Sequence, residues 1–358
     1  MEPTVYQEWA NKYLAGLILA QVARVNDNKP LTYLHRQLLT KQFSVTGKWE
    51  SLSNTSNLVA ADYVAPDSPL PLKKRGALGR ATGDIAKMGM EFQLNETQMN
   101  EIDTLIAVGG TEAQIVGRIY QDLPNSIASI YEKLEYSFLQ GFSTGVAEVT
   151  DADNTGTNIR LDYGYLDANK FTATTDFSNP ASKPFDQIRE MVNKARLDGN
   201  TITTIYARPD VLEDIANSDQ AKDLFAFSQN FVGGNIPAPD LQQLNGVTQR
   251  RFGYVFVPVD RNVRMEKNGI TMPYTPFAAN TLVGVGTNQI GSYVYARLAE
   301  QNRPVAGVTY RTVEDFILVS QFRQNRPSLA EFINSQARVV PVISGVDAIY
   351  TMDTTVAG

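Results

Sequence analysis

The side chains that most often carry out acid–base catalysis or bind metals are scarce in this chain. Histidine occurs once, as His35, in the stretch LTYLHRQLL beside Arg36. Cysteine is absent, so disulfides, thiolate metal sites and cysteine nucleophiles are excluded. A single histidine, with neither a cysteine nor a second histidine to join it, favours a structural or surface role over catalysis.

One acidic stretch resembles a calcium-binding loop. Residues 151–162 (DADNTGTNIRLD) place oxygen ligands at positions one, three and five, a glycine at position six and a carboxylate at position twelve. However, position eight is Asn158 rather than an apolar anchor, and the residues after Asp162 do not continue as a helix. We therefore predict a β-turn with solvated carboxylates and no metal.

Other motifs also fail to define a site. The glycines of GVGTNQIG at 284–291 are spaced wrongly for a dinucleotide fingerprint, and there is no P-loop and no GxSxG elbow. Neighbouring carboxylates such as Glu213 and Asp214 fit a solvated helix face better than an acid–base pair. The prediction is a protein without catalytic residues, metal or cofactor, and hence not an enzyme.

Length and composition indicate a globular protein of about two domains. The 358 residues are 43% hydrophobic and 20% charged, and the net charge is −6. An acidic chain gains little from neutralising phosphates, so it is not expected to bind nucleic acid through its overall field. The apolar run 14–20 is shorter than the roughly 20 residues needed to span a bilayer. We expect no membrane contact.

The N-terminal quarter contains segments that cannot fold by themselves. Residues 4–25 predict an amphipathic helix, whereas residues 41–62 are polar and show no sustained period. Prolines and glycines divide residues 63–95 into short extended runs, which predict a long two-stranded hairpin. An isolated ribbon of two strands is marginally stable in water, so these segments are expected to lie on another element or another molecule.

The clearest helical signal covers residues 111–140. Its apolar residues recur in steps of three or four: Ile115, Ile119, Leu123, Ile127, Ile130, Leu134 and Phe138. Thirty residues at about 1.5 Å each make a rod of about 45 Å, longer than one small domain needs. Pro124 is expected to kink this helix.

Strands and helices alternate after Gly145. Extended runs are predicted at 146–149, 159–165, 202–207, 253–258, 281–286, 291–297, 315–322 and 338–343, and helices at 184–198 and 209–218.

Several segments, in order along residues 30–345, resemble the lambda-type major capsid protein family of tailed phages. They are DYVAPDSPLPLKKR at 62–75, GRATGDIAKM at 79–88, GMEF at 89–92, EKLEY at 132–136, GFSTG at 141–145, LDYG at 161–164 and FSNPASKPFDQI at 177–188. Two departures are Ala86, where the family has proline, and Pro124 inside the long helix.

This resemblance implies an α+β chain with the Hong Kong 97-type capsid fold. Its parts would be an N-terminal arm at 1–62, an E-loop hairpin at 63–95, a P-domain at 96–183 with its spine helix at 111–140, an A-domain at 184–312, returning P-domain strands at 313–337 and a C-terminal segment at 338–358.

The resemblance also implies a function in a virion capsid. The chain would assemble in the host bacterial cytoplasm into hexamers and pentamers of an icosahedral shell around double-stranded DNA, without sequence-specific DNA binding. Scaffolding, portal and decoration proteins are the further partners implied.

We also predict which residues join neighbouring subunits. The basic loop residues Lys73, Lys74, Arg75 and Arg80 would meet acidic helix residues of a neighbour, Glu112, Asp122, Glu132 and Glu135, and Trp9 and Trp49 would add apolar contacts. Exposed pairs of this kind contribute only about 0–1 kcal/mol each.

Two other functions fit parts of the sequence. The first is an encapsulin-like shell, which would contain a cargo enzyme where a phage capsid contains nucleic acid. A cytoplasmic α/β enzyme, such as a carboxylate-based hydrolase, would require residues 41–95 to fold back within a monomer.

Overall fold

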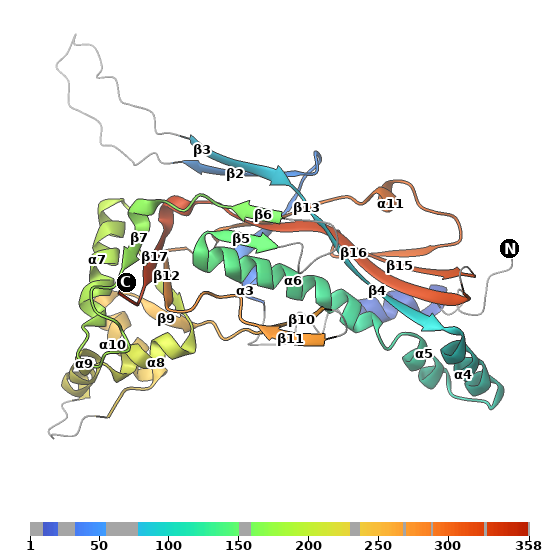
Figure 1. Cartoon of the computed structure of the whole chain (residues 1–358), viewed down its shortest axis with the longest axis horizontal. Coiled ribbons are helices and arrows are strands. Elements are labelled where there is room, and N and C mark those ends of the chain that lie inside the picture. The colour runs from blue at the N-terminus through green and yellow to red at the C-terminus, as the bar shows by residue number, and fades with distance from the viewer. Residues whose placement is uncertain are drawn as a thin grey trace, which may run out of the picture. The chain divides into compact units, whose positions relative to one another are not determined.

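The structure is a computed structural model that describes residues 10–20, 33–54, 78–149, 159–229, 237–267, 270–287, 289–325 and 328–356. The chain divides into two units (Figure 1). The first unit comprises Met1–Trp49, Gly83–Tyr136 and Ser292–Val342, and the second comprises Glu50–Thr82, Ser137–Gly291 and Ile343–Gly358.

The first unit is built on a six-stranded sheet, here called the first sheet. Its strands are β1 (Leu39–Phe43), β13 (Gly291–Ala296), β16 (Ala330–Ile343), β15 (Ile317–Gln324) and β14 (Thr309–Val313), in that order, with β4 (Lys87–Asn95) also paired to β16. The short helices of this unit are η1 (Ala10–Leu14), α3 (Leu34–Leu38), α4 (Glu96–Ala107), α5 (Glu112–Ile119) and α11 (Ala299–Asn302). The buried strand β16 reads as a nearly continuous apolar run from Val339 to Ile343, as strands covered on both faces do.

Strand pairing differs from the predicted hairpin at 63–95. Strand β3 (Leu78–Asp84) pairs with β2 (Lys48–Asn54), and the two form a separate two-stranded sheet. Strand β4 instead joins the first sheet, antiparallel to β16, with Lys87 opposite Arg338 and Asn95 opposite Ala330. The ribbon strands therefore come from 48–54 and 78–84. An alternating pattern identifies a strand but not its partner, which is why the sequence misassigned β4.

The N-terminal arm is better supported than the sequence suggested. Leu14, Ile18 and Tyr33 are buried in the core of the first unit, and Leu38 of α3 is buried as well. For the described part of the arm, the surface on which it lies is supplied by its own chain. The helix predicted at 4–25 is present over its described part, residues 10–20.

The predicted helix at 111–140 is two helices. Helix α5 ends at Ile119, and α6 (Leu123–Thr144) begins after a short turn, so the 22-residue α6 is about 33 Å long rather than 45 Å. Pro124 lies in the first turn of α6, where its missing N–H costs no helical hydrogen bond. Ile115, Ile119, Leu123 and Ile127 nevertheless all face one core, which explains why the period continues across the break.

The second unit is built on a five-stranded sheet with the order β7 (Lys170–Thr172), β17 (Ile349–Asp353), β12 (Thr281–Val285), β8 (Thr204–Ala207) and β9 (Val255–Pro258). The helices α7 (Pro184–Leu197), α8 (Pro209–Asn217), α9 (Asp219–Gln229) and α10 (Leu241–Phe252) gather around it (Figure 1). Two small ribbons, β5 (Val146–Val149) with β6 (Ile159–Asp162) and β10 (Val263–Lys267) with β11 (Ile270–Tyr274), also belong to this unit, as do the turns η3 (Asp167–Asn169) and η4 (Val346–Ala348).

Two predicted boundaries therefore shift. The sheet of the second unit takes β7 from before residue 184 and β17 from after residue 338. Strands β13 and β14 belong to the first sheet, although both begin within the predicted A-domain at 184–312. A boundary at 337/338 also falls inside the continuous strand β16. The predicted helices at 184–198 and 209–218 are confirmed as α7 and α8.

Candidate assembly surfaces

The base of the β2–β3 ribbon is fixed within the first unit. The Trp49 side chain is buried and lies against Gly83, where an added Cβ would come within 2.6 Å of the indole Nε1. The Ile85 N–H donates to the Gly47 carbonyl (3.0 Å), and the guanidinium of Arg338 donates to the Ile85 carbonyl (3.3 Å). Trp49 was predicted to contact a neighbouring subunit. It instead anchors the ribbon to its own chain.

Beyond this base, the two strands pair only with each other among the described strands. A two-stranded ribbon gains too little buried surface to be stable in water without a further surface to lie on. Arg80 belongs to β3, although its side chain is outside the described part of the structure. Trp9 and the basic residues Lys73, Lys74 and Arg75 also lie outside the described residues.

A buried ionic clamp ties α3 to α6. The Glu135 carboxylate accepts hydrogen bonds from the backbone N–H groups of Leu34 (2.8 Å) and His35 (3.0 Å) and from the His35 Nδ1 (2.6 Å). Both side chains are almost completely buried. His35 therefore has a structural role, as its isolation in the sequence indicated.

The clamp removes Glu135 from the predicted contacts with a neighbour. Its carboxylate is buried and occupied within the chain, so that prediction is wrong for this residue. The remaining acidic positions are accessible to different degrees. Glu112 is exposed and paired with Lys12, Glu132 accepts a hydrogen bond from the Tyr33 hydroxyl (3.0 Å), and Asp122 is half-buried.

A second buried polar group lies in the first sheet. Glu331 on β16 is buried opposite Arg323 of β15 and accepts a hydrogen bond from the Gln321 amide (3.1 Å). The Tyr120 hydroxyl donates to the Gln321 side-chain oxygen (3.2 Å), which ties the turn between α5 and α6 to the sheet. Burial raises the pKa of Glu331 to about 7, although the Gln321 hydrogen bond and Arg323 act in the opposite direction. The sequence analysis missed this group, and its one signal is a glutamate in a mostly apolar strand.

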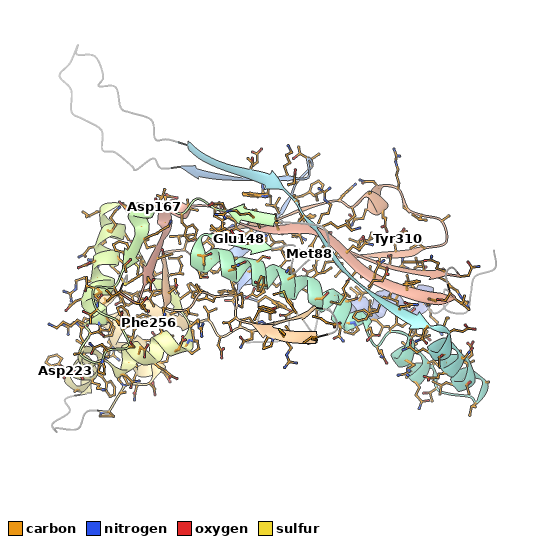
Figure 2. All side chains as sticks on the ribbon, in the orientation of Figure 1. Met88, Glu148, Asp167, Asp223, Phe256 and Tyr310 are labelled. Carbon is orange, nitrogen blue, oxygen red and sulfur yellow. The ribbon has the colours of Figure 1, made fainter. Side chains whose placement is uncertain are left out.

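The first unit and the second unit each carry a surface hollow among the described residues. The hollow of the first unit has a volume of about 600 Å³ and lies beside Tyr310, which Figure 2 labels. Its aromatic wall includes Phe43 and Tyr295, whose ring centroids are 5.4 Å apart, and its rim includes Arg297 and Glu300. The hollow of the second unit, about 350 Å³, lies between α8 and α10.

The charged residues that line the first hollow are Arg297, Glu300 and Asp315, and those that line the second are Glu213 and Asp240. Within the described ranges, no three His, Cys, Asp or Glu side chains gather as a metal site requires. Most of the calcium-like stretch 151–162 lies outside the described residues. Glu213 lines the hollow of the second unit, while burial and the neighbouring Asp210 and Glu213 raise the pKa of Asp214. Among the described helices, none combines the length and apolarity needed to cross a bilayer.

Comparison with solved structures decides the fold. A protein of Escherichia coli CFT073 described as a prophage capsid protein is similar over 94% of this chain and 98% of its own, with a TM-score of 0.57 and 11% identity. The chain has the Hong Kong 97-type fold. The capsid protein of cyanophage A-1(L) has a TM-score of 0.52 and 13% identity over 92% of this chain and 94% of its own. A phage-related protein of Bordetella bronchiseptica RB50 has a TM-score of 0.51 and 9% identity over 94% and 96%.

Neither a protein-family model nor a curated protein sequence matches the chain significantly. With identities of 9–13%, the backbone path of the Hong Kong 97-type fold persists while most side chains differ. Residue-level contacts of this chain therefore depend on its own side chains and not on those of the similar structures.

Proposed function

We propose that the chain is the major capsid protein of a tailed phage or prophage. It assembles into hexamers and pentamers of an icosahedral shell that encloses double-stranded DNA in the virion. The observation that carries this proposal is the similarity to a protein described as a prophage capsid protein over 94% of this chain and 98% of the other. The role is structural, with no catalytic step.

The β2–β3 ribbon supplies the physical reason for assembly. Its base is anchored by Trp49 and Gly83, while its strands lack a third strand among the described residues. The ribbon serves as the E-loop and lies on an adjacent subunit, where it gains the surface that it lacks alone. In this arrangement the first unit contains the P-domain strands and the N-terminal part of the spine helix α6, and the second unit contains the rest of α6 and the A-domain.

The loop between β2 and β3 carries the basic residues Lys73, Lys74 and Arg75. These residues, together with Arg80, meet acidic side chains on a neighbour's helices, for which Glu112, Asp122 and Glu132 remain candidates after the exclusion of Glu135. Each exposed pair contributes about 0–1 kcal/mol, but a closed lattice repeats it in every subunit. Reversing the three basic loop residues to glutamate is expected to reduce shell yield and salt tolerance. Unchanged yield and tolerance would refute the contact.

The interior of the shell encloses DNA without binding it tightly. The net charge of −6 leaves no overall attraction for phosphates, so packaged DNA is held by enclosure rather than by sequence-specific binding. Scaffolding, portal and decoration proteins are the remaining partners of such a shell, and the host cytoplasm is its place of assembly.

Expression of the chain by itself tests the proposal. Sedimentation velocity and negative-stain microscopy are expected to reveal capsomers, tubes or shells. A compact monomer at high concentration would refute it. Shells recovered from the native host are expected to contain DNA. Shells that contain a cargo protein instead would indicate an encapsulin-like compartment.

A further inference from the structure

The hollow of the second unit has the form of a preformed apolar socket. Its lining is Pro209, Leu212, Glu213, Ala216, Pro239, Asp240, Leu241, Leu244 and Pro258, and its volume is about 350 Å³. Three of these residues are prolines, whose φ is fixed by the ring, and only Glu213 and Asp240 are charged. The socket therefore suits an uncharged, bulky side chain better than a polar ligand.

Hydrogen bonds hold the walls of the socket in place. The Asp240 side chain caps α10 by accepting a hydrogen bond from the Gln243 N–H (2.7 Å), and the Gln243 side-chain oxygen accepts one from the Asp240 N–H (2.9 Å). The Asn245 amide bonds both backbone groups of Phe256, its nitrogen donating to the carbonyl (2.8 Å) and its oxygen accepting from the N–H (2.7 Å). Helix α10 is thus fixed to β9, and the socket exists without a bound partner.

The same unit exposes an aromatic side chain that is not packed into its own core. Phe227 on α9 is 80% exposed, whereas Ala221 and Ala226 of that helix are buried against the unit. It lies one helical turn beyond Asp223, which Figure 2 places at the outer end of this unit. A phenylalanine buries roughly 150–250 Å² when it is covered, so leaving it in water is costly. It is not among the residues that line the socket of its own chain.

We propose that Phe227 of one subunit inserts into this socket on the next subunit of the same capsomer. This inference rests on the proposed capsid function. In a ring of identical subunits, each interface joins two different surfaces that are complementary to each other. Each subunit therefore presents the first surface to one neighbour and the second surface to the other neighbour. The exposed phenyl ring and the socket are such a pair, and a buried aromatic anchor in a pocket is the usual centre of a strong interface.

The absence of cysteine makes a direct test possible. Phe227→Cys and Ala216→Cys are placed in two separately tagged chains, which are co-assembled and treated with a short bismaleimide. The expected product is a mixed dimer, which can form only between molecules. When both cysteines are in one chain, the expected product is a ladder that ends at five or six copies. Leu197→Cys, also highly exposed, replaces Phe227→Cys as the matched control and is expected not to cross-link with Ala216→Cys.

Measurements of capsomer assembly complement the cross-linking experiment. Phe227→Ala and the socket-filling variant Ala216→Trp are each expected to raise the protein concentration needed for capsomer formation at least about tenfold. Phe227→Leu is expected to recover part of the loss.

The possible failures are separable. If rings or shells form but the mixed dimer does not, the Phe227 contact is wrong while the capsid function stands. If the variants impair assembly without any cross-link between copies, another partner occupies the socket and the proposal is overturned. If the wild-type chain forms no oligomer at all, both proposals fail.

Discussion

Stability of the first unit is expected to fall as pH rises through neutrality, and Glu331 is the group responsible. Its carboxyl is buried in the first sheet, and its Oε2 has no hydrogen-bond partner among the described residues. Burial raises its pKa from 4.5 to about 7, so the folded state binds the proton more tightly than the unfolded state does. The stabilisation from this group is complete below pH 4.5 and is lost as pH rises through 7.

The magnitude follows from the two pKa values. Their difference corresponds to about 3 kcal/mol, since each tenfold change in proton affinity is about 1.4 kcal/mol. Between pH 5.5 and pH 8.5, a range that stays above the isoelectric point of about 5.1, the expected loss is about 2 kcal/mol. The variant Glu331→Gln remains uncharged over this range while it keeps the size of the side chain. Its stability relative to wild type should therefore improve by about 2 kcal/mol from pH 5.5 to pH 8.5.

Urea unfolding of unassembled protein, followed at several pH values, measures this difference. Glu266→Gln is the matched control, because Glu266 is exposed on β10 and its loss removes a charge without opening the first sheet. The decisive quantity is the change of the free energy of unfolding with pH in Glu331→Gln minus that in wild type. Equal pH dependence in the two proteins would refute the reasoning, since Glu331 would then not be a buried, proton-binding carboxyl.

Two further predictions concern the anchors of the arm and the ribbon. Glu135→Gln removes one of the two acceptor oxygens that face the buried donors around His35, which should cost about 2–3 kcal/mol of stability and speed hydrogen exchange in α3. The control Glu132→Gln should cost less, because Glu132 is only half-buried. Unchanged hydrogen exchange in α3 would contradict the contact between Glu135 and this helix. Gly83→Ala puts a methyl group against the indole of Trp49 and should cost about 1–3 kcal/mol. In a Trp9→Phe background it should also shift the tryptophan emission to longer wavelength, and an unshifted spectrum would contradict the packing at the ribbon base.

Local signals predicted many of the elements. The helices α7 and α8 begin with proline and carry apolar residues at helical spacing, and both appear within one residue of the predicted bounds. The strands β8, β9 and β12 were recognised for a similar reason, because a short buried apolar run between turn residues is visible within a few positions. The sequence also indicated a structural role for His35. For these helices and strands the information lies within one or two turns of the residue concerned, whereas the prediction for His35 came from the composition of the whole chain.

Other features depend on residues far apart in the chain. Strand β4 pairs with β16 about 240 residues later, so nothing near β4 identifies its partner. The acidic residues of the long helix looked alike in the sequence, but Glu135 is buried because the arm brings the N–H groups of α3 onto it.

The spacing of apolar residues does not reveal the break between α5 and α6, because both helices pack against one core. The turn between them is held by the hydrogen bond from Tyr120 to Gln321, which lies far away in the sequence. The socket and the exposed Phe227 likewise follow from how helices of the second unit pack. Periodicity reports which face of an element is buried. Long-range pairing of elements determines which surface covers that face. The roles of Glu135, Glu331 and Phe227 therefore depend on the tertiary structure.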